Sequence, residues 1–300
     1  MPTTSKHGSL PDPPDLEAYF QRIGYAGPRT ATLDTLAALH RLHPQAIPFE
    51  NLDTLLKRPV VLDAAAFERK MLSGGRGGWC FEHNLLLAGV LETLGFGVTG
   101  YAARVLWGVP EGVTRARTHM LLGVECPGAG PGADPGVGGR SRDGADTFIA
   151  DVGFGGLTLT GPLRLVMGIE QTTPHETFRL VEAGSSGFVL EILLRDGWKP
   201  VYSFDRQPQV LADYELSNWY LCNFPESPFV KNLMVARVTP DRRYALFNNR
   251  LSTHYLNGAT EQATLGTVEA LRGVLERELQ IVLPDEAKLE AVLARFARGL

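Results

Sequence analysis

The chain has 300 residues, and its 29 lysines and arginines against 33 aspartates and glutamates give a formal net charge of −4. This acidic balance, without a lysine- or arginine-rich run, argues against a nucleic-acid-binding protein, and no apolar run reaches the roughly 18 residues that a membrane-spanning helix needs. Only three cysteines are present, far apart in the sequence, so we expect a reduced, soluble, cytoplasmic protein without a disulfide framework.

The first third of the chain carries apolar residues at helical spacing. Asp15 and Thr32 are good N-caps for two helices, and we expect the second helix to end at His43-Pro44 because proline interrupts helical hydrogen bonding. A third helix is predicted over residues 61–72. Together these segments predict a helical bundle over residues 1–97.

A glycine-rich loop precedes the strongest helical segment of this bundle. The loop runs over residues 73–79, and leucine and valine residues then recur at helical spacing as far as Gly95, a natural helix-ending residue. Cys80 therefore lies near the start of a helix that follows a glycine-rich loop.

The middle of the chain consists of short β-rich segments divided by Gly, Pro and Asp. They predict consecutive antiparallel strands in a β-barrel over residues 98–206; the segments are VTGYAARVLWG, THMLLGVEC, TFIADVGFG, LTLTGPLRLVM, TFRLVEA, GFVLEILLR and KPVYSFD. Residues 127–146 interrupt them with seven glycines, three prolines and no periodicity, so we expect a mobile hairpin loop there.

Residues 207–300 mix helical and β-rich patterns. A helical stretch begins at 207, the segments NLMVARVTP and YALFNNRLSTHYL predict further strands, and residues 286–298 form an amphipathic helix before Gly299. We expect a linker helix followed by an α/β lid. The fold class is therefore α+β, with an N-terminal helical bundle, a central antiparallel β-barrel and a C-terminal α/β lid.

Three residues of the chain are candidates for a nucleophilic site. A reactive thiol needs a nearby base or cation, and a helix N-terminus helps to stabilise its thiolate. His119 opens one predicted strand and Asp151 ends the next, so pairing of these strands across the 127–146 loop would make the two side chains neighbours. The sequence therefore predicts a triad of Cys80, His119 and Asp151.

Each residue of this triad also has a simpler interpretation. A lone cysteine is usually a small buried apolar residue, a histidine on a strand is usually a structural group with satisfied hydrogen bonds, and an aspartate before Val-Gly usually forms a turn. Cys80 and His83 form half of a zinc site, but no second pair has matching spacing, so we expect no metal. The glycine-rich stretches also lack the patterns of nucleotide-binding loops.

The segment Arg76–Asn84, RGGWCFEHN, resembles the R-G-G-x-C-x-E-x-N signature of the arylamine N-acetyltransferase family. Further blocks of that family stand in the same order between residue 19 and about residue 230: YFQRIGY, IPFENL, RTHMLL, DVGFG and SPF. The last 70 residues carry little that matches.

The resemblance implies an acyltransferase of xenobiotic metabolism, with Cys80, His119 and Asp151 as its catalytic triad and acetyl-CoA as its donor. Family members run a two-step exchange: the cysteine is acetylated while CoA leaves, and the nitrogen of an arylamine, arylhydrazine or hydrazide then takes the acetyl group. One imidazole can serve both steps as acid and base. The family also has three domains, in agreement with the division made above from the sequence pattern.

The resemblance also assigns residues around the triad. Contacts to CoA are implied for Thr118, Phe154 and Gly155, and an acceptor pocket is implied for Phe49, Val105, Phe154 and Phe229, which core packing would explain equally well. A buried pair of Glu50 and Arg76, with Asn84 in the same network, would support the loop of the nucleophile. The chain departs from the family in the longer separation of His119 and Asp151, which would place the 127–146 loop beside the active-site hairpin.

Three other functions stay open from the sequence. An amide synthase of the same family, which closes a macrolactam from a polyketide thioester, would keep the triad. A papain- or transglutaminase-like hydrolase would let water reach the acyl-enzyme, and an inactive relative would only bind CoA or another ligand. The sequence does not indicate the acceptor, the range of acyl donors or the oligomeric state.

Overall fold

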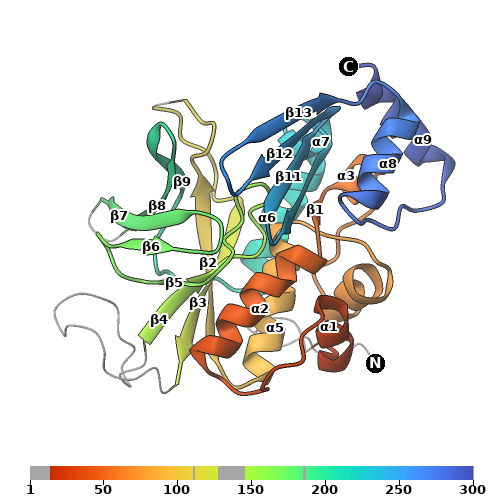
Figure 1. Ribbon diagram of the computed structural model, residues 1–300. Coiled ribbons are helices and arrows are strands. Elements are labelled where there is room, and N and C mark those ends of the chain that lie inside the picture. The colour runs from red at the N-terminus through yellow and green to blue at the C-terminus, as the bar shows by residue number, and fades with distance from the viewer. Residues whose placement is uncertain (1–13, 111, 128–145, 185–186, 300) are drawn as a thin grey trace.

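The computed structural model describes residues 14–110, 112–127, 146–184 and 187–299. Figure 1 shows the helices of the first third, an antiparallel sheet of the middle third and a smaller sheet with two helices at the C-terminal end. The predicted α+β class, with a helical bundle, a barrel and an α/β lid, is confirmed. The predicted mobile loop falls mostly on residues 128–145, which lie outside the described residues. Within the described ranges, no helix has the length and apolar content to cross a membrane.

The first helices begin where their capping residues predict. The Asp15 side chain accepts two main-chain N–H groups at the start of α1, and Thr32 accepts one at the start of α2. The predicted helix over 61–72 corresponds to a short α-helix followed by a π-helix. The elements of this part are α1 Leu16–Ile23, α2 Leu33–Ala46, α3 Leu52–Leu55, α4 Ala64–Phe67, η1 Glu68–Ser73 and α5 Cys80–Thr93.

The prediction that the second helix ends at His43-Pro44 is wrong. α2 continues to Ala46, with Pro44 in its last turn. Pro44 lacks the N–H that would bond the carbonyl of His40, but this loss falls close to the end of the helix. Because His40, His43 and Pro44 are all buried, packing of this face outweighs one lost hydrogen bond.

α5 is the central helix of the bundle and packs against β2 and β3. All its side chains from Cys80 to Leu91 are buried, as expected for a helix that is surrounded on every side. Gly95 follows its end with a φ of +92°, a conformation that glycine adopts without strain. The helix therefore presents Cys80, its first residue, from inside the protein.

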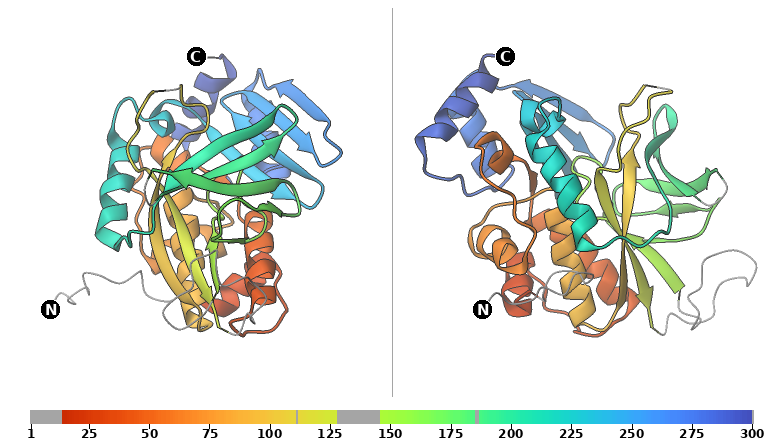
Figure 2. Two further views of the ribbon diagram at one scale, coloured as in Figure 1. Left: turned by 90° about the vertical axis from the view of Figure 1, so that its left-hand side faces the viewer. Right: turned by 180° about the vertical axis from the view of Figure 1, so that it is seen from behind.

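An eight-stranded antiparallel sheet, in the order β5-β4-β3-β2-β9-β8-β7-β6, curls into a nearly closed barrel (Figure 2). Its interior is filled by an apolar cluster that includes Tyr101, Phe178 and Tyr202. The segment LTLTGPLRLVM contributes only a two-residue strand, and β6 has no counterpart among the predicted strands. The strands are β2 Gly97–Val105, β3 His119–Cys126, β4 Asp146–Ala150, β5 Leu163–Arg164, β6 Glu170–Thr172, β7 Thr177–Ala183, β8 Gly187–Leu194 and β9 Gly197–Phe204.

The C-terminal part holds the predicted linker helix, strands and final helix, together with a strand, β13, that the sequence did not suggest. Its elements are α6 Leu211–Asn223, α7 Pro228–Lys231, β10 Met234–Thr239, β11 Arg242–Phe247, β12 Arg250–Tyr255, β13 Thr260–Thr264, α8 Val268–Arg277 and α9 Ala287–Ala297. The two last helices pack on each other and share an apolar cluster with this sheet.

A short strand from the first third, β1 Phe49–Glu50, joins the C-terminal sheet by pairing with β10. Phe49 also bridges to Gly78 in the glycine-rich loop. β1 therefore lies between the loop that precedes Cys80 and the C-terminal sheet, and it connects the two.

Candidate active site

The three residues of the predicted triad lie at the ends of neighbouring elements. Cys80 begins α5, His119 begins β3, and Asp151 directly follows β4. β3 and β4 pair antiparallel, with Leu122 opposite Ala150, so that His119 and Asp151 come together. Because α5 packs against β3, its N-terminus meets this end of the sheet.

The structure brings all three side chains into one buried site. His119 Nε2 donates to Asp151 Oδ2 over 2.7 Å, and Cys80 lies near enough to the same ring to help raise its pKa. Cys80 Sγ lies 3.8 Å from the carbonyl oxygen of Thr118. Cys80 and His119 are each 4% exposed and Asp151 is fully buried, so these groups interact with little screening by water.

The electrostatics of the site favour a charged imidazole. Burial alone lowers the pKa of His119, but the negative charge of Asp151 and hydrogen bonds to Asp151 and Cys80 outweigh burial and raise this pKa to about 10. Burial raises the pKa of Asp151, but the positive charge of His119 and several hydrogen bonds bring it below the ordinary value. An imidazolium beside a sulfur at a helix N-terminus is an environment that stabilises a thiolate.

Asn84 fixes the carboxylate of Asp151. Its Nδ2 donates to Asp151 Oδ1 over 3.1 Å and to the carbonyl of Met120 over 2.7 Å. The N–H of Gly153 donates to the same Oδ1 over 3.0 Å. The side-chain hydrogen bonds of Asn84 that the structure describes therefore run to Asp151, Met120 and Val152, and not to the charged pair of the nucleophile's loop, where the resemblance places this residue.

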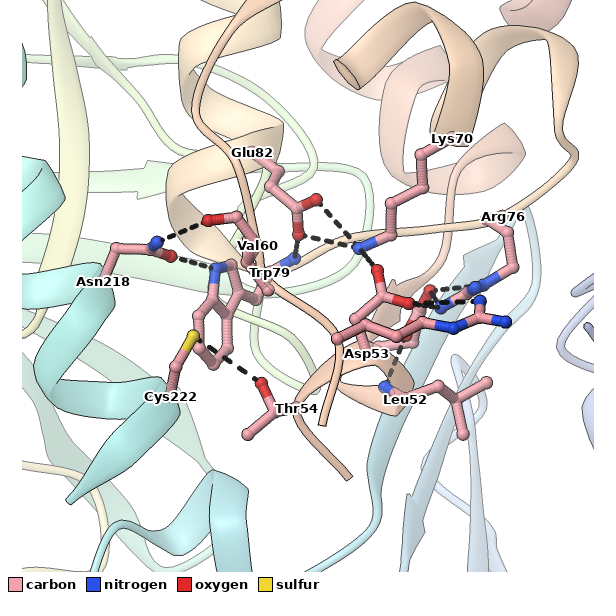
Figure 3. A network of polar contacts seen from close by, with 12 residues as sticks. Leu52, Asp53, Thr54, Val60, Lys70, Arg76, Trp79, Glu82, Asn218 and Cys222 are labelled. Atoms are coloured by element: carbon pink, nitrogen blue, oxygen red, sulfur yellow. Dashed lines mark hydrogen bonds and ion pairs between the residues drawn. The ribbon is translucent and has the colours of Figure 1, made fainter. Parts of the chain in front are cut away.

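That charged pair is part of a larger buried cluster (Figure 3). Arg76 Nε donates to Glu50 Oε1 over 2.8 Å, and its Nη2 lies 3.1 Å from Asp53 Oδ1. Lys70 Nζ lies between Asp53 and Glu82, 2.8 Å from an oxygen of each. Burial lowers the pKa of Lys70, but the neighbouring carboxylates outweigh it and raise this pKa, so the ammonium stays charged.

The cluster reaches the nucleophile through Trp79, the residue before it. Glu82 Oε2 accepts the main-chain N–H of Trp79 over 3.1 Å, which caps the start of α5. The Trp79 indole donates to Asn218 Oδ1 over 3.1 Å, and Asn218 Nδ2 donates to the carbonyl of Val60 over 2.9 Å. Sequence reasoning missed Lys70 and Asn218. Only Glu82 gave a local signal, since an acid at the third position of a helix is a common cap.

Several aromatic side chains lie near the triad residues. The Phe154 ring meets the His119 ring edge to face, with centroids 5.0 Å apart. Phe49 and Phe229 lie 6.1 Å apart, and Phe229 also packs on Trp79 at 5.1 Å. Of these rings, Phe154 contacts the triad directly, and Phe229 packs on the residue before Cys80.

Gly155 and Val105 connect these aromatic residues to the barrel. Gly155 has a φ of +81°, and a Cβ atom there would stand 3.3 Å from the Phe49 ring, so glycine allows a close approach. Val105 pairs with Tyr202 across β2 and β9, and the Tyr202 ring packs 5.4 Å from that of Phe154. Phe229 therefore packs on Phe49, which lies against Gly155, while Val105 and Phe154 both lie beside Tyr202.

The Cys80–His83 pair is not arranged as half of a metal site. His83 Nδ1 lies 2.8 Å from His43 Nε2, and His83 Nε2 lies 3.1 Å from the carbonyl oxygen of Pro48, so both ring nitrogens are occupied. In the part of the chain that the structure describes, no three His, Cys, Asp or Glu side chains gather as metal ligands.

A pocket of about 590 Å³ lies between residues 54–62 and α6, and Asn218 is one of its lining residues. Trp219 and Cys222 line it, and none of the predicted site residues does. The chemistry of the triad is therefore separate from this pocket.

Comparisons with known proteins give one consistent result. A family model described as N-acetyltransferase matches residues 32–288. The arylamine N-acetyltransferase of Mycobacterium tuberculosis is 40% identical over 290 residues, covering 94% of this chain and 96% of that protein. The arylamine N-acetyltransferase of Escherichia coli is 38% identical over 273 residues, covering 91% of this chain and 90% of that protein.

The solved structures agree. The arylamine N-acetyltransferase of Mycobacterium marinum in complex with CoA has a TM-score of 0.85 at 36% identity, covering 94% of this chain and 99% of that one. The family model and the curated relatives both span most of the sequence. The chain therefore belongs to the arylamine N-acetyltransferase family, whose members are acyltransferases.

Proposed function

We propose that this enzyme transfers an acetyl group from acetyl-CoA through Cys80 to the nitrogen of arylamines, arylhydrazines or hydrazides. One observation carries the proposal: the 2.7 Å bond from His119 Nε2 to Asp151 Oδ2 beside a cysteine at the start of α5. The CoA complex of the M. marinum relative supports the choice of donor.

In the first step the Cys80 thiolate attacks the carbonyl carbon of the acetyl thioester. A bond forms between that carbon and Sγ, the bond to the CoA sulfur breaks, and the CoA thiolate takes a proton from the His119 imidazolium. Because the Nε2–H of His119 is hydrogen-bonded to Asp151, the proton leaves from Nδ1. The first N–H groups of α5 have no partner within the helix, and they can stabilise the oxyanion of the tetrahedral intermediate.

In the second step the acceptor nitrogen attacks the S-acetyl carbon. His119, now neutral, takes the proton from that nitrogen, the bond to Sγ breaks, and the thiolate–imidazolium pair is restored. Aromatic amines are weakly basic and uncharged at neutral pH, which suits an apolar site bordered by the Phe154 and Phe229 rings.

The other assigned roles are part of the same proposal. Thr118, Phe154 and Gly155 would contact CoA, and Phe49, Val105, Phe154 and Phe229 would enclose the acceptor. Glu50 and Arg76 would hold the loop of the nucleophile, while Asn84 would hold Asp151. The domain boundaries at 97/98 and 206/207 and a cytoplasmic location stay predictions.

Intact-protein mass spectrometry tests the proposal. Incubation with acetyl-CoA and no amine should add one acetyl group, and a later addition of an arylamine should remove it. Cys80→Ala should abolish labelling, whereas Cys222→Ala, which removes a thiol whose pKa burial raises to about 11, should retain it. Labelling that persists in Cys80→Ala would contradict the role of Cys80.

Other outcomes of the same experiment identify the alternatives. A protein that ignores acetyl-CoA but is acylated by a polyketide thioester would be an amide synthase. Rapid loss of the S-acetyl group without amine would indicate a hydrolase. A Cys80 that does not react with iodoacetamide at neutral pH would indicate an inactive relative.

A further inference from the structure

A buried histidine outside the triad contacts the main chain of the triad acid. His40 lies on α2 and is fully buried. The main-chain N–H of Asp151 donates to His40 Nε2 over 3.0 Å. A nitrogen that accepts a hydrogen bond carries no proton, so the neutral ring of His40 must hold its proton on Nδ1.

This contact satisfies a group that the sheet leaves free. The pairing of β3 with β4 ends at Leu122 and Ala150, one residue before Asp151, so the N–H of Asp151 has no strand partner there. An unpaired N–H in a fully buried position is costly. His40 supplies the acceptor, and Asn84 with Gly153 fixes the carboxylate of the same residue.

The surroundings keep His40 in the accepting form. Burial lowers the pKa of His40 to about 4, although the negative charge of Asp151 and the ring's own main-chain carbonyl act in the opposite direction. His43, on the same helix, is also buried, and burial lowers its pKa well below the ordinary value, so it stays neutral as well. Because Pro44 has no N–H to donate to the His40 carbonyl, this carbonyl can act on the His40 ring. Among the described residues, no group meets hydrogen-bond geometry at Nδ1, so the bond that Nε2 accepts from the Asp151 N–H is the one well-formed hydrogen bond of the ring that the structure describes.

We propose that His40 is a positioning residue of the active site: by accepting the Asp151 N–H, it holds the Asp151 carboxylate in line with His119. His40 touches neither the substrate nor the reacting atoms and acts through the main chain of Asp151. This inference rests on the proposed triad chemistry, in which a correctly placed carboxylate keeps His119 charged.

Two variants separate an acceptor role from simple packing. His40→Leu fills a similar space without an acceptor, and His40→Gln keeps a side-chain acceptor. Displacement of a catalytic group by a fraction of an ångström is costly, so we expect His40→Leu to lower kcat about tenfold or more with little change in the KM for acetyl-CoA. Alkylation of Cys80 by iodoacetamide at neutral pH should slow in parallel, and His40→Gln should recover most of both rates.

Leu39→Ala is the matched control, because it weakens the same helix face but leaves the acceptor in place. It should lower the melting temperature and leave the kcat of the folded protein nearly unchanged. Wild-type rates in a folded His40→Leu variant, or equal losses in His40→Leu and His40→Gln, would overturn the proposal. A wild-type protein that acquires no acetyl group on Cys80 would instead refute the proposed function.

NMR of wild-type protein with ¹⁵N-labelled histidine gives a test that does not depend on folding of a variant. The proposal requires the Nε2 of His40 to be unprotonated at neutral pH, with a coupling to the amide of Asp151. A protonated Nε2 at that pH would overturn it.

Discussion

Two buried histidines near Cys80 have opposite charge states. His119, in the barrel, and His83, one turn along α5 from Cys80, are both almost completely removed from solvent. The pKa of His119 is raised to about 10, whereas burial lowers that of His83 to about 4. The partner of His119 is a carboxylate, whereas the partners of His83 are a neutral histidine and a carbonyl. The hydrogen-bond partner, and not the degree of burial, therefore decides which of these two imidazoles carries a proton.

The partners of His83 also fix every proton in its chain. The Pro48 carbonyl can only accept, so His83 Nε2 donates to it and His83 Nδ1 accepts. His43 Nε2 must then donate to His83, and His43 Nδ1 accepts from the hydroxyl of Tyr19 over 2.9 Å. The histidines on the helical side of the site thus form a neutral chain, and the histidine on the barrel side belongs to an ion pair.

Asp151→Asn should have the largest effect, because it removes the carboxylate that keeps His119 charged. Without the carboxylate charge, burial would dominate at His119 and take its pKa below the ordinary value, so the ring would be neutral at pH 7. We expect S-acetylation of Cys80, followed by rapid-quench mass spectrometry, to slow by about 10³–10⁴-fold, as is typical when the acid of a triad becomes an amide.

Asp146→Asn is the control for that experiment. It removes a carboxylate at the other end of β4, where the acid pairs with Arg164. Its acetylation rate should stay within about twofold of wild type, as for most surface changes away from such sites. A similar loss in both variants would show that the charge of Asp151 has no special role.

The triad could be predicted because each member has a local signal. Cys80 follows a glycine-rich loop at a helix start, His119 opens a strand, and Asp151 ends the next one. The pairings β2–β3–β4 and β7–β8–β9 follow in the same way, since consecutive segments pair antiparallel, whereas the pairing of β2 with β9 does not.

The supporting residues lacked such signals. Lys70 stands in a polar stretch that resembles an exposed helix surface, and His40 stands near a predicted helix end. Their roles depend on contacts with residues 12 or more positions away, such as Glu82 and Asp151. The two-residue strand β1 could not be predicted from the sequence either, because it forms only by pairing with β10.

The neutral buried histidines should make the protein less stable in acid. His40 and His83 have folded-state pKa values of about 4 against about 6.5 in an unfolded chain, so the unfolded state binds more protons between these values. The contribution of these two neutral histidines to the free energy of unfolding is therefore complete above about pH 6.5 and is lost as the pH falls toward 4. From about pH 7.5 to about pH 5 each histidine should remove about 2 kcal/mol from the free energy of unfolding.

His119 should act in the opposite direction. Its pKa is raised on folding, so its contribution is complete below about pH 6.5 and is lost as the pH rises toward 10. Urea denaturation at a series of pH values measures both effects, the loss of stability in acid and the loss of stability in alkali. His40→Gln is the matched variant. Between about pH 7.5 and about pH 5 its free energy of unfolding should fall by about 2 kcal/mol less than that of the wild type, because one titrating histidine is missing. An identical loss of stability in acid in the two proteins would contradict a neutral, buried His40.

Tyr19→Phe tests the far end of the neutral chain with the smallest effect. The change removes the hydroxyl that donates to His43 and leaves a buried acceptor without a partner, which typically costs about 1–2 kcal/mol in the free energy of unfolding. Tyr25→Phe is the matched control, because the Tyr25 hydroxyl bonds the Pro28 carbonyl at the surface and its loss should cost less than about 0.5 kcal/mol. Neither variant should change the rate of S-acetylation, because the ion pair of His119 and Asp151 needs nothing from this chain. A Tyr19→Phe protein of normal stability but reduced acetylation would mean that the two sides of α5 are coupled, and that the neutral histidines also help to position Cys80.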